Sequence, residues 1–536
     1  MAEHVLDVSN LSVEFHTAGK VVEAVRNVSF HLDRGETLAI LGESGSGKSV
    51  SASAVMDLID CPPGRITSGS IHYRGEDLLH MPAGRRREIN GRKIAMIFQD
   101  PLAHLNPVYP VGWQIAEAMR VHGMPAGDAR RRTIELMGRV GIRDPEQRAR
   151  AYPHQFSGGQ RQRLMIAMAL GYDPDVLIAD EPTTALDVTV QLQILRLLQA
   201  LRDETGMGLL LITHDLGVVA EMADRAIVMN AGEVVETGAV RDVLKHPGHP
   251  YTQKLVAAVP GQGSIRQGAV SDAEPILSVR SLNKHFGAYH ALRDVSFDLH
   301  AGEAVAIVGE SGSGKSTTAR AIVRLDDADS GSVHYGGRDL CALGEKEMFR
   351  LRRDIQMIFQ DPTQSLNPRM SVFQIISEAW RIHADILPRN RWRERVLELL
   401  DLVGMQAEHA DRYPHQFSGG QRQRIAIARA LAMQPRIIIC DEAVSALDVS
   451  VQSQVIRLLD NLRDRLGVAF IFIAHDLPVV RDFADRVVVM KEGAIVEKGD
   501  VVQIFEAPAH AYTQALLAAS LEPDPDRRGG QHRESA

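Results

Sequence analysis

The chain has little cysteine and no long apolar run. Its three cysteines, Cys61, Cys341 and Cys440, have no CxxC spacing, so neither a zinc site nor a disulfide framework is indicated, and a reducing cytoplasm fits. Apolar stretches such as Val468 to Ala474 are far shorter than the ~18 residues of a membrane-spanning helix. They indicate buried parallel strands, so any membrane part of a working complex must come from another polypeptide.

The chain also lacks an excess of positive charge. Lys and Arg total 60 against 68 Asp and Glu, a formal net charge of -8, which argues against a nucleic-acid footprint. The runs Arg85 to Arg87 and Arg130 to Arg132 are short, and we expect both on solvated surface. The N-terminal segment MAEHVLDVSN has neither a basic n-region nor an apolar h-region, so we expect no signal peptide.

One motif of the chain occurs twice. Each copy of GESGSGKS fits the glycine-rich loop G-x-x-x-x-G-K-[ST], whose backbone N–H groups cradle nucleotide phosphates. The lysine of this loop reaches the β- and γ-phosphates, and the final hydroxyl holds Mg²⁺. The residues expected to hold nucleotide here are Gly42, Ser44, Gly45, Gly47, Lys48, Ser49 and Val50 in the first copy, and Gly309, Ser311, Gly312, Gly314, Lys315, Ser316 and Thr317 in the second.

The rest of the chain repeats as well. Gln99 and Gln360 lie 261 positions apart, whereas Lys48 and Lys315 lie 267 apart, so the first half has six extra residues, which we place around CPPGRITSGS. A repeat this long is a domain duplication rather than a solenoid. We expect one domain over residues 1–262, a polar linker over 263–275, a second domain over 276–522 and a disordered tail over 523–536.

Each half alternates short apolar strands with helices. The strands VLIAD and LLLIT in the first half correspond to RIIICD and FIFIA in the second, and this order predicts a mainly parallel sheet with helices on both faces. A β-rich opening predicts an antiparallel subdomain, and a long Arg-rich region predicts a helical one. The predicted fold is therefore α/β, with two tandem P-loop domains.

Four further motifs follow each phosphate loop in the same order: MIFQDP, YPHQFSGGQRQR, an acidic pair after an apolar strand, and a histidine after the last strand. A carboxylate at the tip of a buried strand can hold Mg²⁺, which assigns Asp180 and Asp441 to the metal. Its neighbour can polarise the attacking water, which assigns Glu181 and Glu442 as general bases. The helix behind SGGQ offers a second anion site at its N-terminus.

In this order the motifs resemble those of ABC transporter ATPases with two nucleotide-binding domains fused in one chain. The resemblance covers almost the whole sequence, and SGGQ is highly specific to that family. It implies hydrolysis of ATP with Mg²⁺ by two ABC ATPase domains of the P-loop NTPase fold. It also makes His214 and His475 the γ-phosphate sensors, and it makes Gln99 and Gln360 the residues that join Mg²⁺ or water to the transmembrane contact.

In this family the SGGQ element closes over the nucleotide of the opposite domain. ATP would then hold the halves together until hydrolysis releases them. The signature residues concerned are Ser157, Gly159 and Gln160 in the first half, and Ser418, Gly420 and Gln421 in the second. One composite site would join Lys48 with Ser418 and Gly420, and the other Lys315 with Ser157 and Gly159.

Two further segments resemble the oligopeptide/dipeptide importer ATPases: QDP...LNP after each phosphate loop, and the elements HPYTQKLVAAVP and HAYTQALLAAS near each domain's end. Fusion of both ATPases resembles the subgroup for glutathione, microcin or peptide uptake in bacteria. The resemblance implies a peripheral protein at the cytoplasmic face of the inner membrane, with two membrane permease subunits and, through them, a periplasmic or lipid-anchored solute-binding protein. The solute stays open among peptides, glutathione, nickel chelates, opines and glycosides.

Several absences complete the prediction. Many members of this subfamily bind an iron-sulfur cluster through cysteines beyond the C-terminal element, but no cysteine follows either copy closely here, so we predict no cluster. We also predict no nucleic-acid partner and no membrane span of the chain's own. The rival class is a soluble ABC ATPase of the ribosome or of DNA repair, and the linker of about fifteen residues with few charges argues against it. A scaffold without turnover is disfavoured because both glutamates are intact.

The adenine contact is the least determined part of the prediction. Phe15 and Phe286 lie at matching places upstream of the two loops and could stack on the base. Each could equally be a core aromatic at a strand end, and Tyr289 is a rival in the second half.

Overall fold

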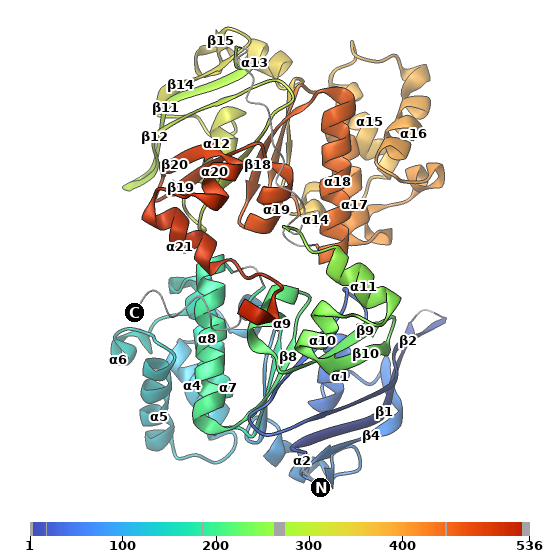
Figure 1. Cartoon of the computed structure of the whole chain (residues 1–536), viewed down its shortest axis with the longest axis vertical. Coiled ribbons are helices and arrows are strands. Elements are labelled where there is room, and N and C mark those ends of the chain that lie inside the picture. Colours follow the sequence, from blue (N-terminus) through green and yellow to red (C-terminus); the bar gives the residue numbers. More distant parts are fainter. Residues whose placement is uncertain (1–3, 18, 185, 262–273, 445–446, 528–536) are drawn as a thin grey trace. The chain divides into compact units, whose positions relative to one another are not determined.

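The computed structural model describes residues 4–17, 19–184, 186–261, 274–444 and 447–527. The chain divides into two compact units, one from residues 1–258 with 521–536 and the other from Val259–Ser520 (Figure 1). The predicted linker over 263–275 and the predicted tail over 523–536 lie largely outside the described residues. Among the described helices, none combines the length and the apolar character needed to cross a membrane.

A six-stranded sheet forms the centre of the first unit, in the order β10-β9-β3-β8-β7-β6, parallel except for the β9–β10 pair. Its strands β7 and β8 are buried throughout. Alternate residues face two cores: Leu177 and Ala179 face the helical region, whereas Val176 and Ile178 face the antiparallel sheet. This burial on both faces explains the continuous apolar runs. The central strands are β3 (Thr37–Leu41), β6 (Ile94–Ile97), β7 (Val176–Asp180), β8 (Gly208–Ile212), β9 (Arg225–Asn230) and β10 (Glu233–Ala239).

An antiparallel sheet in the order β2-β1-β4-β5 and a set of helices complete the first unit. The sheet comprises β1 (Leu6–Thr17), β2 (Lys20–Leu32), β4 (Gly64–Tyr73) and β5 (Glu76–Asp77). The helices are α1 (Lys48–Val55), α2 (Ala83–Ile89), α3 (Pro101–His104), α4 (Val111–Arg120), α5 (Ala126–Arg139), α6 (Pro145–Arg148), α7 (Gly158–Ala169), α8 (Val188–Thr205), α9 (Leu216–Met222), α10 (Val240–Lys245) and α11 (Pro250–Ala257).

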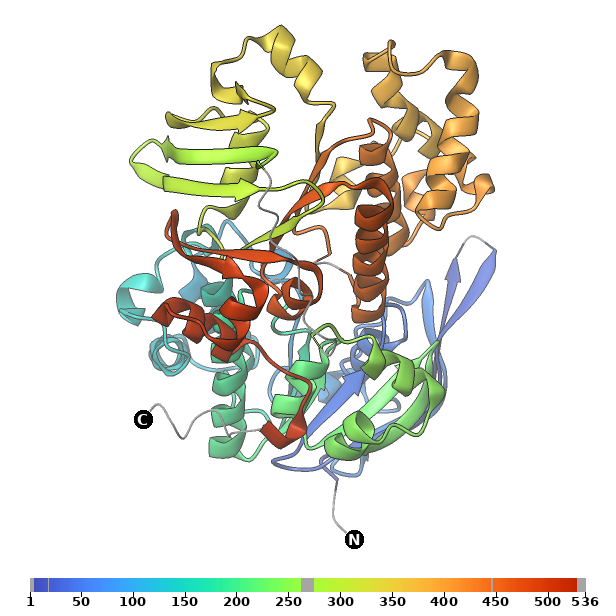
Figure 2. The ribbon, with the colours of Figure 1, turned by 45° about the horizontal axis from the view of Figure 1, so that its top comes forward.

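The second unit repeats both sheets, in the orders β12-β11-β14-β15 and β16-β17-β18-β13-β19-β20. In Figure 2 its antiparallel strands (green to yellow) and its helical region (orange) lie apart. The strands are β11 (Leu277–Phe286), β12 (Tyr289–Leu299), β13 (Ala304–Val308), β14 (Ser330–Tyr335), β15 (Arg338–Asp339), β16 (Ile355–Ile358), β17 (Ile437–Asp441), β18 (Ala469–Ala474), β19 (Arg486–Lys491) and β20 (Ala494–Asp500). The helices are α12 (Lys315–Ile322), α13 (Glu345–Leu351), α14 (Pro362–Ser365), α15 (Val372–Ile382), α16 (Trp392–Leu402), α17 (Gly419–Leu431), α18 (Val449–Leu466), α19 (Leu477–Phe483), α20 (Val501–Glu506) and α21 (Ala511–Ala519).

The described C-terminal residues pack on the first unit. Leu521 lies against the core of that unit, where Gly217 of α9 leaves room, since a Cβ there would come within 2.9 Å of the Leu521 Cβ. The Lys245 ammonium on α10 lies 2.7 Å from a carboxylate oxygen of Asp524. A short 3-10 helix, Pro525–Arg527, follows. Asp524 and Pro525–Arg527 lie inside the predicted disordered tail over 523–536, so the expectation of disorder is wrong for its first, described residues. The limits of the domains, linker and tail stay predictions.

The two arginine runs do not lie wholly on solvated surface. Arg132 forms an exposed ion pair with Glu135 at 2.6 Å, as expected. The expectation is wrong for Arg86, which is buried on α2 and donates a hydrogen bond to the Val55 carbonyl at the end of α1. Burial lowers the pKa of its guanidinium, and the carbonyl end of a helix stabilises its positive charge.

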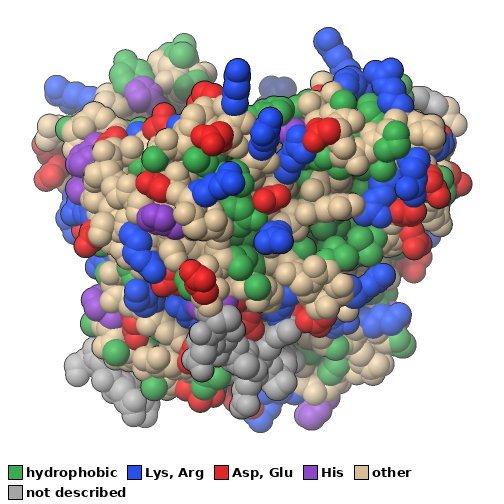
Figure 3. Space-filling view, turned by 90° about the horizontal axis from the view of Figure 1, so that it is seen from above, with side chains coloured by type: hydrophobic (Ala, Val, Ile, Leu, Met, Phe, Trp, Pro, Cys, Tyr) green, Lys and Arg blue, Asp and Glu red, His purple; other side chains and the backbone are tan. Residues whose placement is uncertain are grey.

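Charged side chains of both signs share the face of the molecule that Figure 3 shows. In the helical region of the second unit, Arg393 pairs with Asp411 at 2.7 Å and Arg395 with Glu398 at 2.6 Å. Paired charges of this kind are ordinary for a solvated surface.

Candidate nucleotide-binding sites

The first phosphate loop connects β3 to α1. Gly42 and Gly47 allow close approach of neighbouring backbone, because a Cβ would lie 2.3 Å from the Met229 carbonyl oxygen at Gly42 and 2.5 Å from the Ala24 carbonyl oxygen at Gly47. Both also have positive φ values, 153° and 99°. Only glycine fits such positions without strain, and these glycines let the loop pack closely against neighbouring backbone. The loop leads into the N-terminus of α1, and helix N-termini bind phosphate.

The loop lysine of each unit folds back over its own loop. The Lys48 ammonium donates to the carbonyls of Gly42 at 2.7 Å and Glu43 at 2.9 Å. Lys315 repeats this geometry with Gly309 at 2.8 Å and Glu310 at 3.0 Å. Each buried ammonium is thereby held at the mouth of the cradle that its loop forms.

The hydroxyl that follows each lysine faces a buried carboxylate. Ser49 donates to an oxygen of Asp180 at 3.0 Å, and Ser316 to Asp441 at 2.8 Å. Burial raises the pKa of Asp180 to about 6 and also raises the pKa of Asp441. A hydroxyl beside a carboxylate provides the hard oxygen donors that suit Mg²⁺, so the residues fit this ion.

The glutamate after each metal carboxylate is held in a left-handed backbone conformation. Glu181 has φ 46° and Glu442 has φ 47°, and each donates its backbone N–H to the adjacent strand, at Ile212 and Ile473. This conformation is uncommon for a residue other than glycine and is typical of functional positions.

Three side chains contact the Glu181 carboxylate: Gln99 donates at 2.7 Å and Thr184 at 2.9 Å, and the His214 Nδ1 lies 3.1 Å away. Burial alone would raise the pKa of Glu181, but the hydrogen bond and charge of His214 outweigh it and hold this pKa below its usual value. The carboxylate is thus kept ionised.

The second unit repeats this cluster with small differences. Gln360 donates to Glu442 at 2.7 Å, and the His475 Nδ1 lies 3.5 Å from the same carboxylate. Burial would lower the pKa of His475, but Glu442 outweighs this and raises it, while the pKa of Glu442 is lowered. The sequence prediction missed Thr184. A hydroxyl residue at the matching position, Ser445, is a signal for it, but that residue lies outside the described part.

The signature residues begin a separate helix in each unit. Ser157 caps α7 by accepting from the Gln160 N–H at 3.3 Å, and the Gln160 side chain accepts from the Ser157 N–H at 3.2 Å. Ser418 and Gln421 form the same capping box on α17. Both serines are exposed at the helix N-terminus, and the positive end of the helix dipole favours an anion there.

The signature glycines allow α7 and α17 to pack closely on the next helix. A Cβ at Gly159 would lie 2.3 Å from the Val190 side chain of α8, and one at Gly420 would lie 2.2 Å from Val451 of α18. No larger residue fits either position without moving these helices.

The candidate adenine contacts differ between the units. Phe15 packs partly into the core, beside Gly64, where a Cβ would lie 2.9 Å from its ring. Phe286 is 48% exposed and pairs across a hairpin with Tyr289. The Tyr289 hydroxyl donates to the Gly312 carbonyl of the phosphate loop at 3.0 Å, so this rival residue lies directly at the site.

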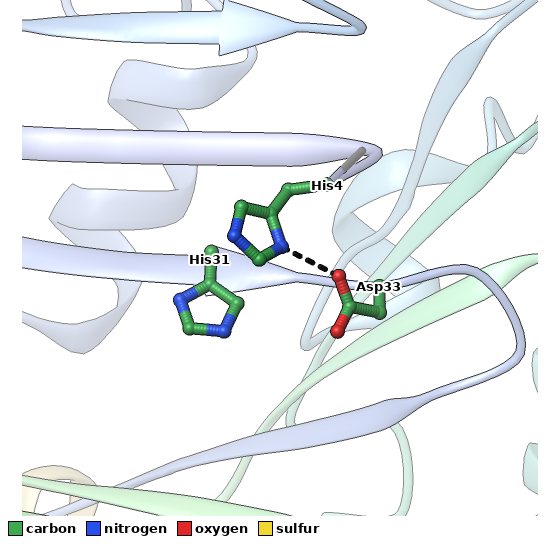
Figure 4. Close-up of side chains that lie close together, drawn as sticks. All are labelled: His4, His31 and Asp33. Carbon is green, nitrogen blue, oxygen red and sulfur yellow. Dashed lines mark hydrogen bonds and ion pairs between the residues drawn. The ribbon is translucent and has the colours of Figure 1, made fainter. Parts of the chain in front are cut away.

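A histidine cluster lies on β2 and the segment before β1 (Figure 4). His4 Nδ1 lies 2.6 Å from the Asp33 carboxylate, and the rings of His4 and His31 are 4.0 Å apart. The potential ligand atoms of the three residues lie within 4.8 Å of one another. However, the Arg225 guanidinium lies 2.7 Å from the His31 Nε2. Burial and this charge lower the pKa of His31, and the His31 Nε2 is already engaged by a guanidinium, so we assign no metal to this cluster.

Comparison with known proteins agrees with this geometry. The family model described as "ABC transporter" matches residues 25–184 and 292–445. The model described as "Oligopeptide/dipeptide transporter, C-terminal region" matches residues 235–281 and 496–536. Each model therefore matches once in each half of the chain.

Individual relatives extend over nearly the whole chain. The glutathione import ATP-binding protein GsiA of Salmonella typhimurium is 48% identical and aligns over 98% of this chain and 90% of its own length. GsiA of Escherichia coli O157:H7 is 47% identical, over 99% and 92%. Among solved structures, cbiO1 from Clostridium perfringens has a TM-score of 0.41 with 32% identity, covering 44% of this chain and 92% of that one. A dimeric cassette bound to ADP and Pi has a TM-score of 0.40 with 27% identity, covering 44% and 98%.

The chain belongs to the ABC transporter family. It is an ATP-binding subunit with two fused ATPase cassettes, and it couples ATP hydrolysis to import. The predicted α/β fold of two P-loop domains is confirmed, and so is the predicted transport function. The soluble alternatives, a ribosomal factor or a DNA-repair ATPase, find no support among these relatives.

Proposed function

We propose that the chain energises uptake of peptides and peptide-like solutes, with glutathione as the first candidate. The observation that carries the proposal is the oligopeptide/dipeptide C-terminal region, which occurs once in each half. The names of relatives at 47–48% identity add glutathione. The working complex would contain two membrane permeases, fed by a periplasmic or lipid-anchored solute-binding protein. The chain would act as a peripheral subunit at the cytoplasmic face of the inner membrane.

The residues of each site have distinct roles in this proposal. Backbone N–H groups of the loop and the ammonium of Lys48 or Lys315 would bind the β- and γ-phosphates. The hydroxyl of Ser49 or Ser316 and the carboxylate of Asp180 or Asp441 would hold Mg²⁺. When bound, Mg²⁺ neutralises charge on the phosphate oxygens.

Hydrolysis would depend on the glutamates. Glu181, kept ionised beside His214, would accept a proton from the attacking water. Gln99 would orient that carboxylate through its 2.7 Å hydrogen bond, and Glu442, His475 and Gln360 would play the same parts in the second unit. The helix N-termini behind Ser157 and Ser418 would bind phosphate, each on the nucleotide that the other unit holds, as the family resemblance implies.

An uptake assay tests the transported solute. A bacterial strain deleted for this chain should take up radiolabelled glutathione only at background level, and the unchanged chain should restore uptake. The matched control is Lys48→Ala/Lys315→Ala, which should not restore it because neither site would hold ATP. Uptake of glutathione and of di- and tripeptides at full rate in the deletion strain would contradict the proposal.

Removal of the metal carboxylates tests the Mg²⁺ assignment. Asp180→Asn/Asp441→Asn should raise the Mg²⁺ concentration for half-maximal ATP turnover at least ~10-fold, because a neutral amide binds a hard cation more weakly than a carboxylate. The matched control is Asp173→Asn, an exposed residue paired with Arg132 and Arg139. An unchanged Mg²⁺ requirement in the double variant would rule out these two carboxylates as the metal site.

A further inference from the structure

A tyrosine near the end of each unit contacts the phosphate loop of that unit. The Tyr251 hydroxyl, on α11, accepts a hydrogen bond from the backbone N–H of Glu43 at 3.3 Å. The Tyr512 hydroxyl, on α21, accepts from the Glu310 N–H at 3.1 Å. In sequence, the two residues of the first pair are 208 positions apart and those of the second pair are 202 apart. The C-terminal element of the transporter subfamily therefore reaches the nucleotide site directly.

A carboxylate fixes the segment that presents the first tyrosine. Glu236 of β10 accepts from the backbone N–H groups of Gly248 at 2.7 Å and His249 at 3.1 Å. The His249 ring then caps α11 by accepting from the Tyr251 N–H at 3.2 Å. These bonds set the position of α11 against the sheet that carries the phosphate loop.

The second unit builds the same arrangement in different surroundings. Glu497 accepts from Ala509 at 2.7 Å and from His510 at 3.1 Å. The first helical residue is Ala511 in place of a proline, and the Lys491 ammonium lies 4.8 Å from the Tyr512 ring, where the first unit has an asparagine. The hydroxyl contact is retained despite these differences, so it does not depend on one particular packing.

The loop residue that each tyrosine contacts also contacts the loop lysine. The N–H of Glu43 donates to Tyr251, while its carbonyl accepts from the Lys48 ammonium at 2.9 Å. Glu310 links Tyr512 to Lys315 in the same way, at 3.1 and 3.0 Å. Each hydroxyl therefore holds the orientation of the peptide segment against which the lysine rests.

We propose that Tyr251 and Tyr512 are positioning residues of the two ATP sites. Each hydroxyl holds the residue that follows the leading glycine of its loop, Glu43 or Glu310. This contact keeps the loop lysine and the backbone N–H groups of the loop pointed at the phosphates. The inference rests on the proposed function of Lys48 and Lys315 as phosphate ligands. It gives the C-terminal element a part in nucleotide binding.

Substitution by phenylalanine tests the hydroxyl alone. In the full chain, Tyr251→Phe/Tyr512→Phe should weaken ATP binding and raise the KM for ATP about 2- to 10-fold, the range of one lost hydrogen bond, with a smaller change in kcat. The thermal unfolding temperature should fall by only about 2–4 °C, because the ring and its packing remain and one hydrogen bond per unit is lost. Gln253→Ala/Gln514→Ala is the matched control on the same helices, since these side chains bond only to the preceding Pro247 and Pro508 carbonyls in the contacts described.

A purely structural role gives the opposite pattern. In that case the phenylalanine variant would bind ATP like the unchanged chain, and only Tyr251→Ala/Tyr512→Ala would lose stability and binding together. Unchanged ATP affinity in the phenylalanine variant would overturn the inference. Lys48→Ala/Lys315→Ala, measured in parallel, should abolish ATP binding, and if it did not, the assignment of the phosphate site itself would be at fault.

Discussion

The double variant Glu181→Gln/Glu442→Gln is expected to bind ATP and to hydrolyse it at least ~100-fold more slowly than the unchanged chain. The exchange keeps the size of both side chains and removes their basicity. A glutamine oxygen at position 181 can still accept the bond that Gln99 donates at 2.7 Å, so the loop around it should keep its shape. Phosphate release and retained nucleotide, measured on one preparation, check the two halves of this prediction.

The control for this variant is a glutamate outside the sites. Glu204 is 63% exposed and pairs with Arg139 at 2.9 Å, so Glu204→Gln should hydrolyse ATP normally. Near-normal hydrolysis in the double variant would show that another group activates the water. Loss of ATP binding would show instead that the two carboxylates hold the nucleotide complex together rather than acting as bases.

The order of the parallel strands, which is the same in both units, explains why the order of the motifs predicted so much of each site. Ser49 and His214 lie after β3 and β8, Asp180 is the last residue of β7, and these parallel strands end at the same edge of one sheet. Side chains at the carboxyl ends of parallel strands converge there. Residues more than a hundred positions apart are therefore brought together by topology that the apolar runs already indicate.

Other contacts depend on packing that no local pattern contains. The burial of Arg86 under the end of α1 could not be predicted, because an arginine run reveals charge and not exposure. The Tyr251 contact with Glu43 depends on the placement of α11 by Glu236. The repeated YTQ segment belongs to the elements that resemble the importer subfamily, but it did not indicate which residue the tyrosine contacts.

The sequence predicted where the two halves differ, but not what structure the differing segments form. Of the six extra residues of the first half, placed around CPPGRITSGS, four are accounted for by β4, which has ten residues against six in β14. At the candidate adenine residues, Phe286 has Tyr289 opposite it in its hairpin, whereas Phe15 lies opposite Val22. The two units therefore have matching contacts in the phosphate loop and differ at the candidate adenine residues, so we expect the two sites to differ in ATP affinity.

The pairing of signature serines with phosphate loops carries the second large prediction. The family resemblance assigns Ser418 to the nucleotide of Lys48, and Ser157 to that of Lys315. Lys48→Ala with Ser418→Asp then places both changes on one nucleotide, and we expect about half of the bound ATP to remain. Lys48→Ala with Ser157→Asp places one change on each nucleotide, and we expect ATP binding to fall to background.

Aspartate is the right substitution because it adds a negative charge without disturbing the folding of the signature helix. It caps helices as well as serine does, so α7 and α17 should keep their N-termini while a negative charge repels the γ-phosphate. An aspartate at Gly159 would instead clash with Val190, since even a Cβ would come within 2.3 Å, and a loss of binding could then reflect misfolding.

Bound ATP per chain is the proper readout, because coupling between sites can abolish turnover after a single lesion. If the Ser157 pair kept one nucleotide and the Ser418 pair kept none, each signature helix would serve the phosphate loop of its own unit, and the family's pairing would not hold for this chain.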